Sequence, residues 1–404
     1  MNHKVIVLAA GASSRFYPYN ARHKSAYIIA GKTILEYTLE SVKNAGIKEA
    51  AVVVRQEDME FFKERINING LKVDYVVQKE FLGQGNAILA AKKYLNGPFF
   101  VINAHQINLG DVFNLMLDKF EKNRGSVAFA TALTHEPWKY GVVEKKGEKV
   151  VRIIEKPEKK SEQFDERIVG IYLFKPEFLT LLNKVGTKEY QLEEAMNLAV
   201  EEGVLAVKID EDFPMTLKYP WDLFAIKNFI LKSLGGRKGK GVNISKTATI
   251  KGEVFFEDGV KVSDYGMVEG PAYLGKNSVV GAYSQVRGGS ILEEGGVLQR
   301  YVDFKSSHLG ENASIHSGFV GDSIIGADCK VGAGFITANK RLDRKEVFCS
   351  VKGVKTPTGL IGVGAFLGEG VSVGVQTSTM PGVIVGSGSA IMPASVVKSD
   401  EYAK

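Results

Sequence analysis

At 404 residues the chain is long enough for two domains of ordinary size, and its 45% hydrophobic and 24% charged content exclude a disordered or fibrous protein. The net charge of +6 is spread along the chain, which favours anionic small ligands over a nucleic-acid surface. The first apolar run is too short to span a membrane and leads into a loop without a cleavage region, so we expect a cytoplasmic protein with no membrane partner. Two cysteines, Cys329 and Cys349, are too few for a disulfide framework, and we expect free buried thiols.

The first half alternates strand-like and helical patterns from Lys4 to about Ile230. Apolar runs such as VIVLAAG, AAVVV and PFFVIN alternate with segments of helical periodicity such as TILEYTLESVKNAG. Strand followed by helix, repeated, is typical of a mainly parallel sheet covered by helices. The sequence therefore predicts a doubly wound α/β domain over residues 1–232, with a linker at 233–247.

The second half has a period of six residues. An apolar residue recurs at every sixth position from Ile250 to Leu298, and the series restarts at Ile361 and ends at Val397. Glycine follows many of these inward positions, where the backbone must turn tightly. This pattern is what a triangular coil of short parallel strands requires, with three steps to each turn. We expect a parallel β-helix of hexapeptide repeats over residues 248–404, interrupted by a basic loop near 340–358.

A phosphate-binding turn is predicted directly after the first strand. The stretch VLAAGASSRFYPYNARHKSAYIIAGKTILEYTLE contains glycine and small residues whose backbone amides can face a phosphate. Arg15 and Lys24 stand at fixed offsets from this turn, as cations that stabilise a triphosphate or leaving pyrophosphate do. The alternative is two solvated charges on a loop.

The whole stretch resembles the signature of sugar-1-phosphate nucleotidylyltransferases, with Gly31 and Lys32 also on matching positions. The resemblance implies the fold of nucleotide-diphospho-sugar transferases. Later segments resemble those with which the family contacts the base and the sugar. The resemblance implies nucleotide or phosphate binding by Gly11, Arg15, Lys24, Gln78 and Gly83, and sugar binding by Tyr140, Gly141, Glu155 and Lys156.

The departures from that family concern its metal site. The strand PFFVIN ends in a polar tip with His105, where the family has an aspartate that holds magnesium, and Thr216 stands where a second aspartate is expected. Neither side chain supplies the negative charge that magnesium prefers. Ile168 replaces a sugar-binding asparagine. His105 could bind a softer metal, contact phosphate, or be structural. We favour a domain that binds nucleotide or sugar phosphate without turnover, with no metal assigned and Mg²⁺ a doubtful cofactor.

The coil resembles the left-handed β-helix of hexapeptide-repeat acyltransferases, a family that usually forms homotrimers. Because Ile315 keeps the inward phase, we expect His316 to face outward, either as a general base or as a solvated surface histidine. The segment from His316 to Ser323 resembles the acetyltransferase core of bifunctional enzymes that carry both halves. The resemblance implies His316 as the catalytic base and Asn339 as a residue that faces the acceptor sugar.

The two resemblances together cover nearly the whole chain. They imply an acetyl-CoA-dependent acetyltransferase acting on an amino sugar phosphate such as glucosamine 1-phosphate, with a catalytically impaired nucleotidylyltransferase-like domain. The basic loop could grip phosphates of coenzyme A or sugar, or be solvated. Alternatives are a fully bifunctional sugar-1-phosphate nucleotidylyltransferase/acetyltransferase with an altered metal site, which would also join the sugar phosphate to UTP or another nucleoside triphosphate, or a non-catalytic ligand-sensing assembly subunit. We expect nucleotide and sugar phosphate ligands, acetyl-CoA as co-substrate, and a homotrimer formed through the β-helix.

Overall fold

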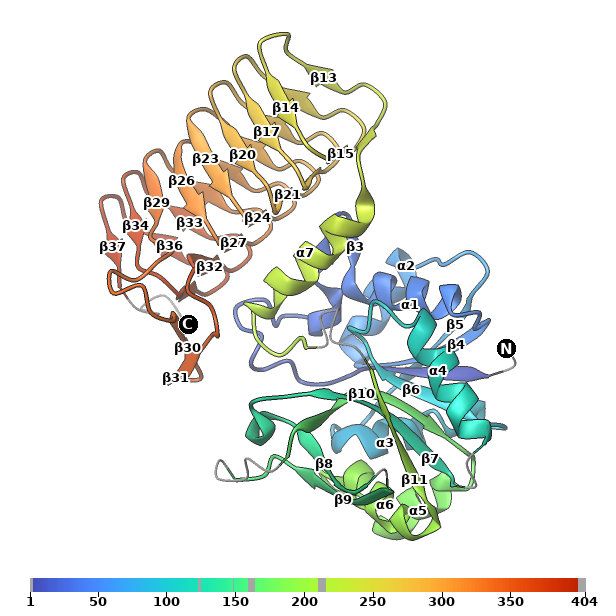
Figure 1. The fold of residues 1–404 in the computed structure, drawn as a ribbon. Coiled ribbons are helices and arrows are strands. Elements are labelled where there is room, and N and C mark those ends of the chain that lie inside the picture. Colours follow the sequence, from blue (N-terminus) through green and yellow to red (C-terminus); the bar gives the residue numbers. More distant parts are fainter. Residues whose placement is uncertain (1–2, 123–124, 148, 159–163, 210–215, 399–404) are drawn as a thin grey trace. The chain divides into compact units, whose positions relative to one another are not determined.

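The chain forms two compact units in a computed structural model that describes residues 3–122, 125–147, 149–158, 164–209 and 216–398 (Figure 1). Unit 1 comprises Met1–Ala12 and Thr33–Thr216, and unit 2 comprises Ser13–Lys32 and Leu217–Lys404. The segment Ser13–Lys32, from within the first half of the sequence, thus belongs to the unit that contains the coil. Among the described residues, no helix has the length and apolar character needed to cross a membrane.

Unit 1 is built on a nine-stranded sheet with the order β11-β7-β10-β6-β1-β4-β5, and β8 and β9 lie off this path. β1 pairs in parallel with both β4 and β6, whereas β10 is antiparallel to β6 and β7. The sheet is therefore mainly parallel, as predicted. Its strands are β1 (Lys4–Ala9), β4 (Glu49–Val54), β5 (Lys72–Val77), β6 (Phe99–Asn103), β7 (Val127–Leu133), β8 (Gly141–Lys146), β9 (Lys149–Glu155), β10 (Glu166–Phe174) and β11 (Val204–Lys208).

Helices cover both faces of this sheet. Neighbouring residues of a strand point to opposite faces, and Phe100 stacks on Phe113 of α4 with ring centroids 3.9 Å apart. On the other face Phe99 contacts Phe174, which stacks on Phe178 of α5 at 4.1 Å. The doubly wound α/β fold is confirmed. The helices of this unit are α1 (Ile34–Asn44), α2 (Met59–Arg65), α3 (Gly83–Ala90), α4 (Gly110–Glu121), α5 (Phe178–Val185) and α6 (Gln191–Leu198), with short 3-10 turns η2 (Gln56–Asp58), η3 (Lys92–Tyr94), η4 (Pro137–Lys139) and η5 (Val200–Glu202).

Unit 2 contains a coil of three parallel sheets, each of eight strands (Figure 1). Consecutive strands belong to the three sheets in rotation, so a residue pairs with the one 18 positions later, as Val262 does with Val280. The in-phase apolar residues from Phe256 to Leu298 are all buried and form one continuous core. The predicted left-handed parallel β-helix is confirmed as the fold class.

The strands of the coil are two to four residues long. The first sheet contains β12 (Arg237–Lys238), β15 (Val254–Phe256), β18 (Ala272–Leu274), β21 (Ser290–Leu292), β24 (His308–Leu309), β27 (Ile324–Ile325), β32 (Ala365–Leu367) and β35 (Val383–Val385). The second contains β13 (Asn243–Ile244), β16 (Lys261–Val262), β19 (Val279–Val280), β22 (Val297–Leu298), β25 (Ser314–Ile315), β28 (Lys330–Val331), β33 (Ser372–Val373) and β36 (Ala390–Ile391). The third contains β14 (Thr249–Lys251), β17 (Met267–Glu269), β20 (Gln285–Arg287), β23 (Val302–Lys305), β26 (Gly318–Gly321), β29 (Phe335–Thr337), β34 (Ser378–Thr379) and β37 (Val396–Val397).

Two details of the repeat differ from the sequence prediction. Ile361, the expected restart of the inward series, is 57% exposed, because the basic excursion has not yet rejoined the coil at that point. The excursion contains an antiparallel hairpin of β30 (Phe348–Val351) and β31 (Val354–Pro357), and the inward series resumes at Leu367. In addition, β12 and β13 lie inside the expected linker 233–247 and pair with the next turn of the coil.

The segment Ser13–Lys32 packs on the coil within unit 2. The hydroxyl of Tyr19 donates a hydrogen bond to the carbonyl of Ile324 at 2.7 Å, and the Tyr19 ring packs edge to face against Phe16 and Tyr27. This segment contains the 3-10 turn η1 (Lys24–Ala26) and β2 (Ile28–Ile29); β3 (Lys32–Thr33) follows, and α7 (Asp222–Leu234) also belongs to unit 2. Both cysteines are free and buried, as predicted.

Gly281 lies where the backbone of the next turn of the coil leaves no room for a side chain. A Cβ added there would lie 1.4 Å from the carbonyl oxygen of Gln299, which is backbone and cannot move aside alone. We expect Gly281→Ala to lower the free energy of unfolding by about 3 kcal/mol, since overpacking a well-ordered core costs this much. Thermal or denaturant unfolding measures the loss. Gly97→Ala, where a Cβ meets nothing within 4 Å, is the control and should change little.

Candidate functional site

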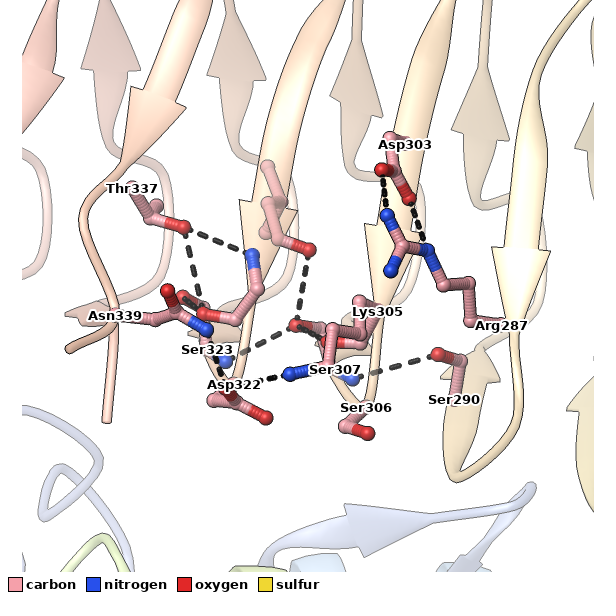
Figure 2. Close-up of polar contacts among 12 residues, drawn as sticks. Arg287, Ser290, Asp303, Lys305, Ser306, Ser307, Asp322, Ser323, Thr337 and Asn339 are labelled. Atoms are coloured by element: carbon pink, nitrogen blue, oxygen red, sulfur yellow. Dashed lines mark hydrogen bonds and ion pairs between the residues drawn. The ribbon is translucent and has the colours of Figure 1, made fainter. Parts of the chain in front are cut away.

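A polar cluster lies where strands of the third sheet end on successive turns of the coil (Figure 2). The carboxylate of Asp322 accepts a hydrogen bond from Lys305 Nζ at 3.2 Å and another from the amide of Asn339. The three residues come from the ends of β23, β26 and β29, so the rise of the coil stacks them. Asn339, predicted to face an acceptor, therefore has its amide orientation fixed by a half-buried ion pair.

His316 follows β25 and is exposed, so its predicted outward orientation is confirmed. Its backbone is held on both sides: its amide donates to the carbonyl of Val331 at 2.9 Å, and its carbonyl accepts from the amide of Arg300 at 3.2 Å. The imidazole is thus presented to solvent from a fixed position. Within the part of the chain that the structure describes, no hydrogen bond joins the His316 imidazole to Asn339.

Phe319 connects the two regions along β26. A Cβ added at Gly321 would lie 2.7 Å from Phe319 Cζ and 3.0 Å from Asn339 Nδ2, so the ring tip and the amide meet over this glycine. Phe319 is three residues after His316 on the same stretch of chain. His316 thus lies in the connection between β25 and β26, and Asp322 directly follows β26, so the histidine and the cluster are at opposite ends of this strand.

The two predicted phosphate-binding cations lie in unit 2. Arg15 is exposed, whereas Lys24 Nζ donates a hydrogen bond to the carbonyl of Leu217 at 2.5 Å. Burial lowers the pKa of Lys24 to about 8, with Asp222 opposing this shift. The Lys24 amide donates to the hydroxyl of Ser13 at 3.0 Å. Lys24 is therefore a positioned cation rather than a solvated one.

We expect phosphate binding to weaken as the pH rises from 7 to 9, because Lys24 loses its charge near pH 8. Its pKa is lowered from 10.5, so folding releases a proton between about pH 8 and 10.5, and the contribution of Lys24 to the free energy of unfolding rises with pH there. Isothermal titration with inorganic tripolyphosphate measures the affinity at pH 7 and at pH 9. The wild-type protein should lose several-fold more affinity over this range than Lys24→Arg, whose side chain stays charged. Equal pH profiles would contradict a role for the Lys24 ammonium.

Unit 1 brings together the residues predicted to recognise the base. Gln78 Nε2 donates to the carbonyl of Gly83 at 3.3 Å and to Asn86 Oδ1 at 2.9 Å, and Gln78 itself is buried. Gly83 begins α3 with a φ of +87°. Gly11, predicted for the phosphate turn, is exposed just after β1.

The four predicted sugar-contacting residues also lie together in unit 1. Gly141 of β8 pairs with Glu155 of β9, and the amide of Lys156 donates to the carbonyl of Tyr140 at 3.0 Å. Lys156 and Glu155 form an ion pair at 3.2 Å. The strand register therefore places both segments at one end of the β8–β9 hairpin.

Arg167 is a residue that the sequence did not single out. Its Nη1 donates a hydrogen bond to Thr216 Oγ1 at 3.1 Å, and its guanidinium carbon lies 4.6 Å from the centre of the Tyr140 ring. Arg167 precedes Ile168, the position where the sugar-binding asparagine is replaced. A cation therefore contacts one of the two positions at which the resemblance would place a metal-binding aspartate.

The residues present do not fit a magnesium ion. His105 is 6% exposed, and the neighbouring Gln106 is buried and donates to the carbonyl of Val169 at 2.6 Å. Thr216 is neutral and bonded to a guanidinium, which repels a divalent cation. Within the described ranges, no group of three or more histidine, cysteine, aspartate or glutamate side chains could hold a metal ion.

Comparison with known proteins identifies the family of the first half of the chain. Residues 4–222 match the family model described as Nucleotidyl transferase. Together with the β-helix, this defines a transferase in which a nucleotidyltransferase domain precedes a hexapeptide-repeat coil.

Relatives extend the match to nearly the full chain. Proteins named "Bifunctional protein GlmU" from two strains of Methanococcus maripaludis are 34% and 38% identical over 98% of this chain and 94% of their own length. A "Bifunctional sugar-1-phosphate nucleotidylyltransferase/acetyltransferase" of Sulfurisphaera tokodaii is 30% identical over 98% of both chains. The chain belongs to this family of bifunctional sugar-1-phosphate nucleotidylyltransferase/acetyltransferases.

Proposed function

We propose that the chain is an acetyl-CoA-dependent acetyltransferase acting on an amino sugar phosphate of the glucosamine 1-phosphate type. The exposed His316, held by backbone bonds just before β26, and the Lys305, Asp322 and Asn339 cluster at the other end of that strand are the observation that carries this proposal. The names of the relatives, which include acetyltransferase, support it. His316 is the general base, and Asn339 faces the acceptor.

The chemistry is a single acyl transfer. The amine nitrogen of the sugar attacks the thioester carbonyl, a C–N bond forms, and the C–S bond to coenzyme A breaks. His316 takes the proton that the attacking amine loses, and the leaving thiolate takes up a proton to give the thiol. Basic residues of the excursion at 340–358 bind phosphates of coenzyme A or of the sugar.

The proposal also includes the assembly and location of the protein. The coil assembles as a homotrimer, and the protein is cytoplasmic.

The first domain, on this proposal, binds nucleotide or sugar phosphate without metal-dependent turnover. The hydrogen bond from Arg167 to Thr216 supports this, because a guanidinium at that position repels the magnesium ion on which nucleotidyl transfer depends. Gly11, Gln78 and Gly83 of unit 1 are proposed nucleotide contacts, and Arg15 and Lys24 of unit 2 are proposed phosphate contacts.

A release assay for the coenzyme A thiol tests the proposal. Wild-type protein is incubated with acetyl-CoA and a panel of amino sugar phosphates, with the corresponding hydroxy sugar phosphates as controls. Thiol release that depends on the amino group supports the acetyltransferase. No release with any acceptor would contradict it and favour a non-catalytic ligand-sensing subunit.

The fully bifunctional enzyme is the second candidate, and the names of the relatives favour it. In that case the first domain would also join a sugar phosphate to UTP or another nucleoside triphosphate. Magnesium-dependent exchange of labelled pyrophosphate by the wild-type protein separates the two candidates, since only the bifunctional enzyme would catalyse it.

A further inference from the structure

Glu293 is a buried carboxylate that the proposed acetyl transfer does not use. It follows β21 in the coil and is 1% exposed. Its Oε1 accepts hydrogen bonds from the amide of Ala30 at 2.7 Å and from His308 Nε2 at 2.9 Å, and its Oε2 accepts from the amide of Gly31 at 2.8 Å. A carboxylate taken out of water is costly unless it is paired, and here three N–H donors satisfy it.

The partner backbone is shaped to hold an anion. Ala30 and Gly31 both have left-handed φ values, +50° and +78°, and Ala30 is a residue that rarely adopts this conformation. With both residues in this conformation, the two consecutive N–H groups bond the two oxygens of one carboxylate. The turn at Ala30 and Gly31 is therefore matched to the carboxylate of Glu293, which comes from a part of the sequence 263 residues away.

His308 extends this contact to a third residue of the segment. It is 3% exposed and lies on β24, the strand next to β21, where it pairs with Ile291. Its Nδ1 bonds with the hydroxyl of Tyr27 at 2.9 Å while its Nε2 contacts Glu293. The coil thus holds the segment at residue 27 and again at residues 30 and 31.

The same segment carries the proposed phosphate-binding cations. Lys24 lies between Tyr19, which bonds to the carbonyl of Ile324, and Tyr27, which bonds to His308. Apolar residues alone could pack a segment on the coil, but they would not fix its backbone amides. The polar contacts specify the path of the chain on both sides of Lys24.

We propose that Glu293 and His308 are positioning residues for phosphate binding by the segment Ser13–Lys32. They act through the backbone of residues 27–31, which they hold so that Lys24 and Arg15 are presented to a phosphate chain. The proposal rests on the proposed function in one respect, namely that this segment binds a nucleotide or sugar phosphate. It adds that two residues of the coil, which take no part in the proposed acetyl transfer, hold the phosphate-binding segment in place.

The test compares Glu293→Gln with Glu294→Gln in the full chain. The first removes one acceptor oxygen and turns an NH₂ group towards N–H donors, whereas Glu294 is an adjacent exposed carboxylate that forms a long ion pair with Lys276 at 3.9 Å. The probe is inorganic tripolyphosphate, which carries the phosphate chemistry without a base. We expect Glu293→Gln to weaken its binding about tenfold or more, as the loss of a charged hydrogen-bond acceptor does, and Glu294→Gln to leave it unchanged.

Four further measurements separate positioning from a general loss of structure. Hydrogen exchange at the amides of Ala30 and Gly31 should accelerate in Glu293→Gln only. Thiol release from acetyl-CoA should stay close to wild type in both variants, and the thermal unfolding midpoint should fall by only about 2–4 °C per kcal/mol lost in Glu293→Gln and not at all in Glu294→Gln. His308→Gln, which keeps an N–H donor, should retain more affinity than His308→Phe, and Tyr27→Phe should give a smaller loss.

The outcomes are distinct. Tripolyphosphate binding that is equal in wild type and Glu293→Gln overturns the positioning role and leaves the proposed function standing. A wild-type protein that does not bind tripolyphosphate overturns both the positioning role and the proposed phosphate binding by Ser13–Lys32, whereas the proposed acetyl transfer is decided by thiol release. Parallel loss of binding, thiol release and thermal stability in Glu293→Gln, with no difference between His308→Gln and His308→Phe, shows a structural role only.

Discussion

Replacing His316 with alanine is expected to lower the rate of thiol release from acetyl-CoA by about 100- to 10,000-fold, the usual contribution of a general base. The amine of the acceptor must lose a proton as it attacks the thioester, and His316 is the proposed group to take it. Because His316 is exposed and its backbone bonds to Val331 and Arg300 do not involve the side chain, the substitution should leave the fold intact. The loss should appear in kcat more than in KM.

A matched control is available in His135→Ala, which removes another exposed histidine, in unit 1. Its thiol release should equal that of the wild type. In addition, the pH dependence of the rate that a general base imparts should vanish in His316→Ala. Turnover that survives the substitution with its pH profile intact would remove His316 from the mechanism.

The coil was the most predictable part of the fold because its period is short and every turn repeats the same burial. An apolar residue at each sixth position has only one way to face a common core, and the buried series from Phe256 to Leu298 follows it. The prediction that Ile361 faces inward was wrong for a physical reason. The six-residue period predicts burial only while the chain follows the coil, and the excursion with the hairpin of β30 and β31 lies outside the coil. The sequence shows the period but not the point of return.

The sequence predicted the direction of a site residue where that direction follows from the inward or outward position of its neighbours in the chain. His316 follows inward Ile315, so its outward direction could be inferred from alternation. The cluster of Lys305, Asp322 and Asn339 could have been found by a search at spacings of 17 to 18 residues, since this is one turn of the coil. That signal is present in the sequence but is easily hidden among exposed polar residues.

Contacts between distant parts of the sequence were not predictable. Nothing local to Ala30 or Gly31 indicates a carboxylate 262 or 263 residues away, and nothing local to Thr216 indicates Arg167. Both contacts depend on where separate elements pack. They are also the contacts that alter the functional interpretation, because one links the coil to the phosphate segment and the other places a cation at a position expected to hold a metal ligand.

The contact between Arg167 and Thr216 changes what a restoration experiment should show. We expect wild-type protein to give no magnesium-dependent pyrophosphate exchange and His105→Asp plus Thr216→Asp to give little. Arg167 Nη1 lies 3.1 Å from the Thr216 hydroxyl, so it would pair with the introduced carboxylate. Two unit charges about 4 Å apart near a protein surface attract by about 4 kcal/mol, enough to compete with a metal ion.

Adding Arg167→Met to the two aspartates should release that carboxylate and raise exchange at least about tenfold over the double variant, since each 1.4 kcal/mol is a factor of ten. Incorporation of labelled pyrophosphate into nucleoside triphosphate, with and without Mg²⁺, measures it. Arg167→Met alone is the control and should give no exchange, because it restores no carboxylate. Exchange by the wild type at the rate of the triple variant would show that His105 and Thr216 already serve catalysis. Exchange by the double variant equal to the triple would show that Arg167 does not oppose the metal.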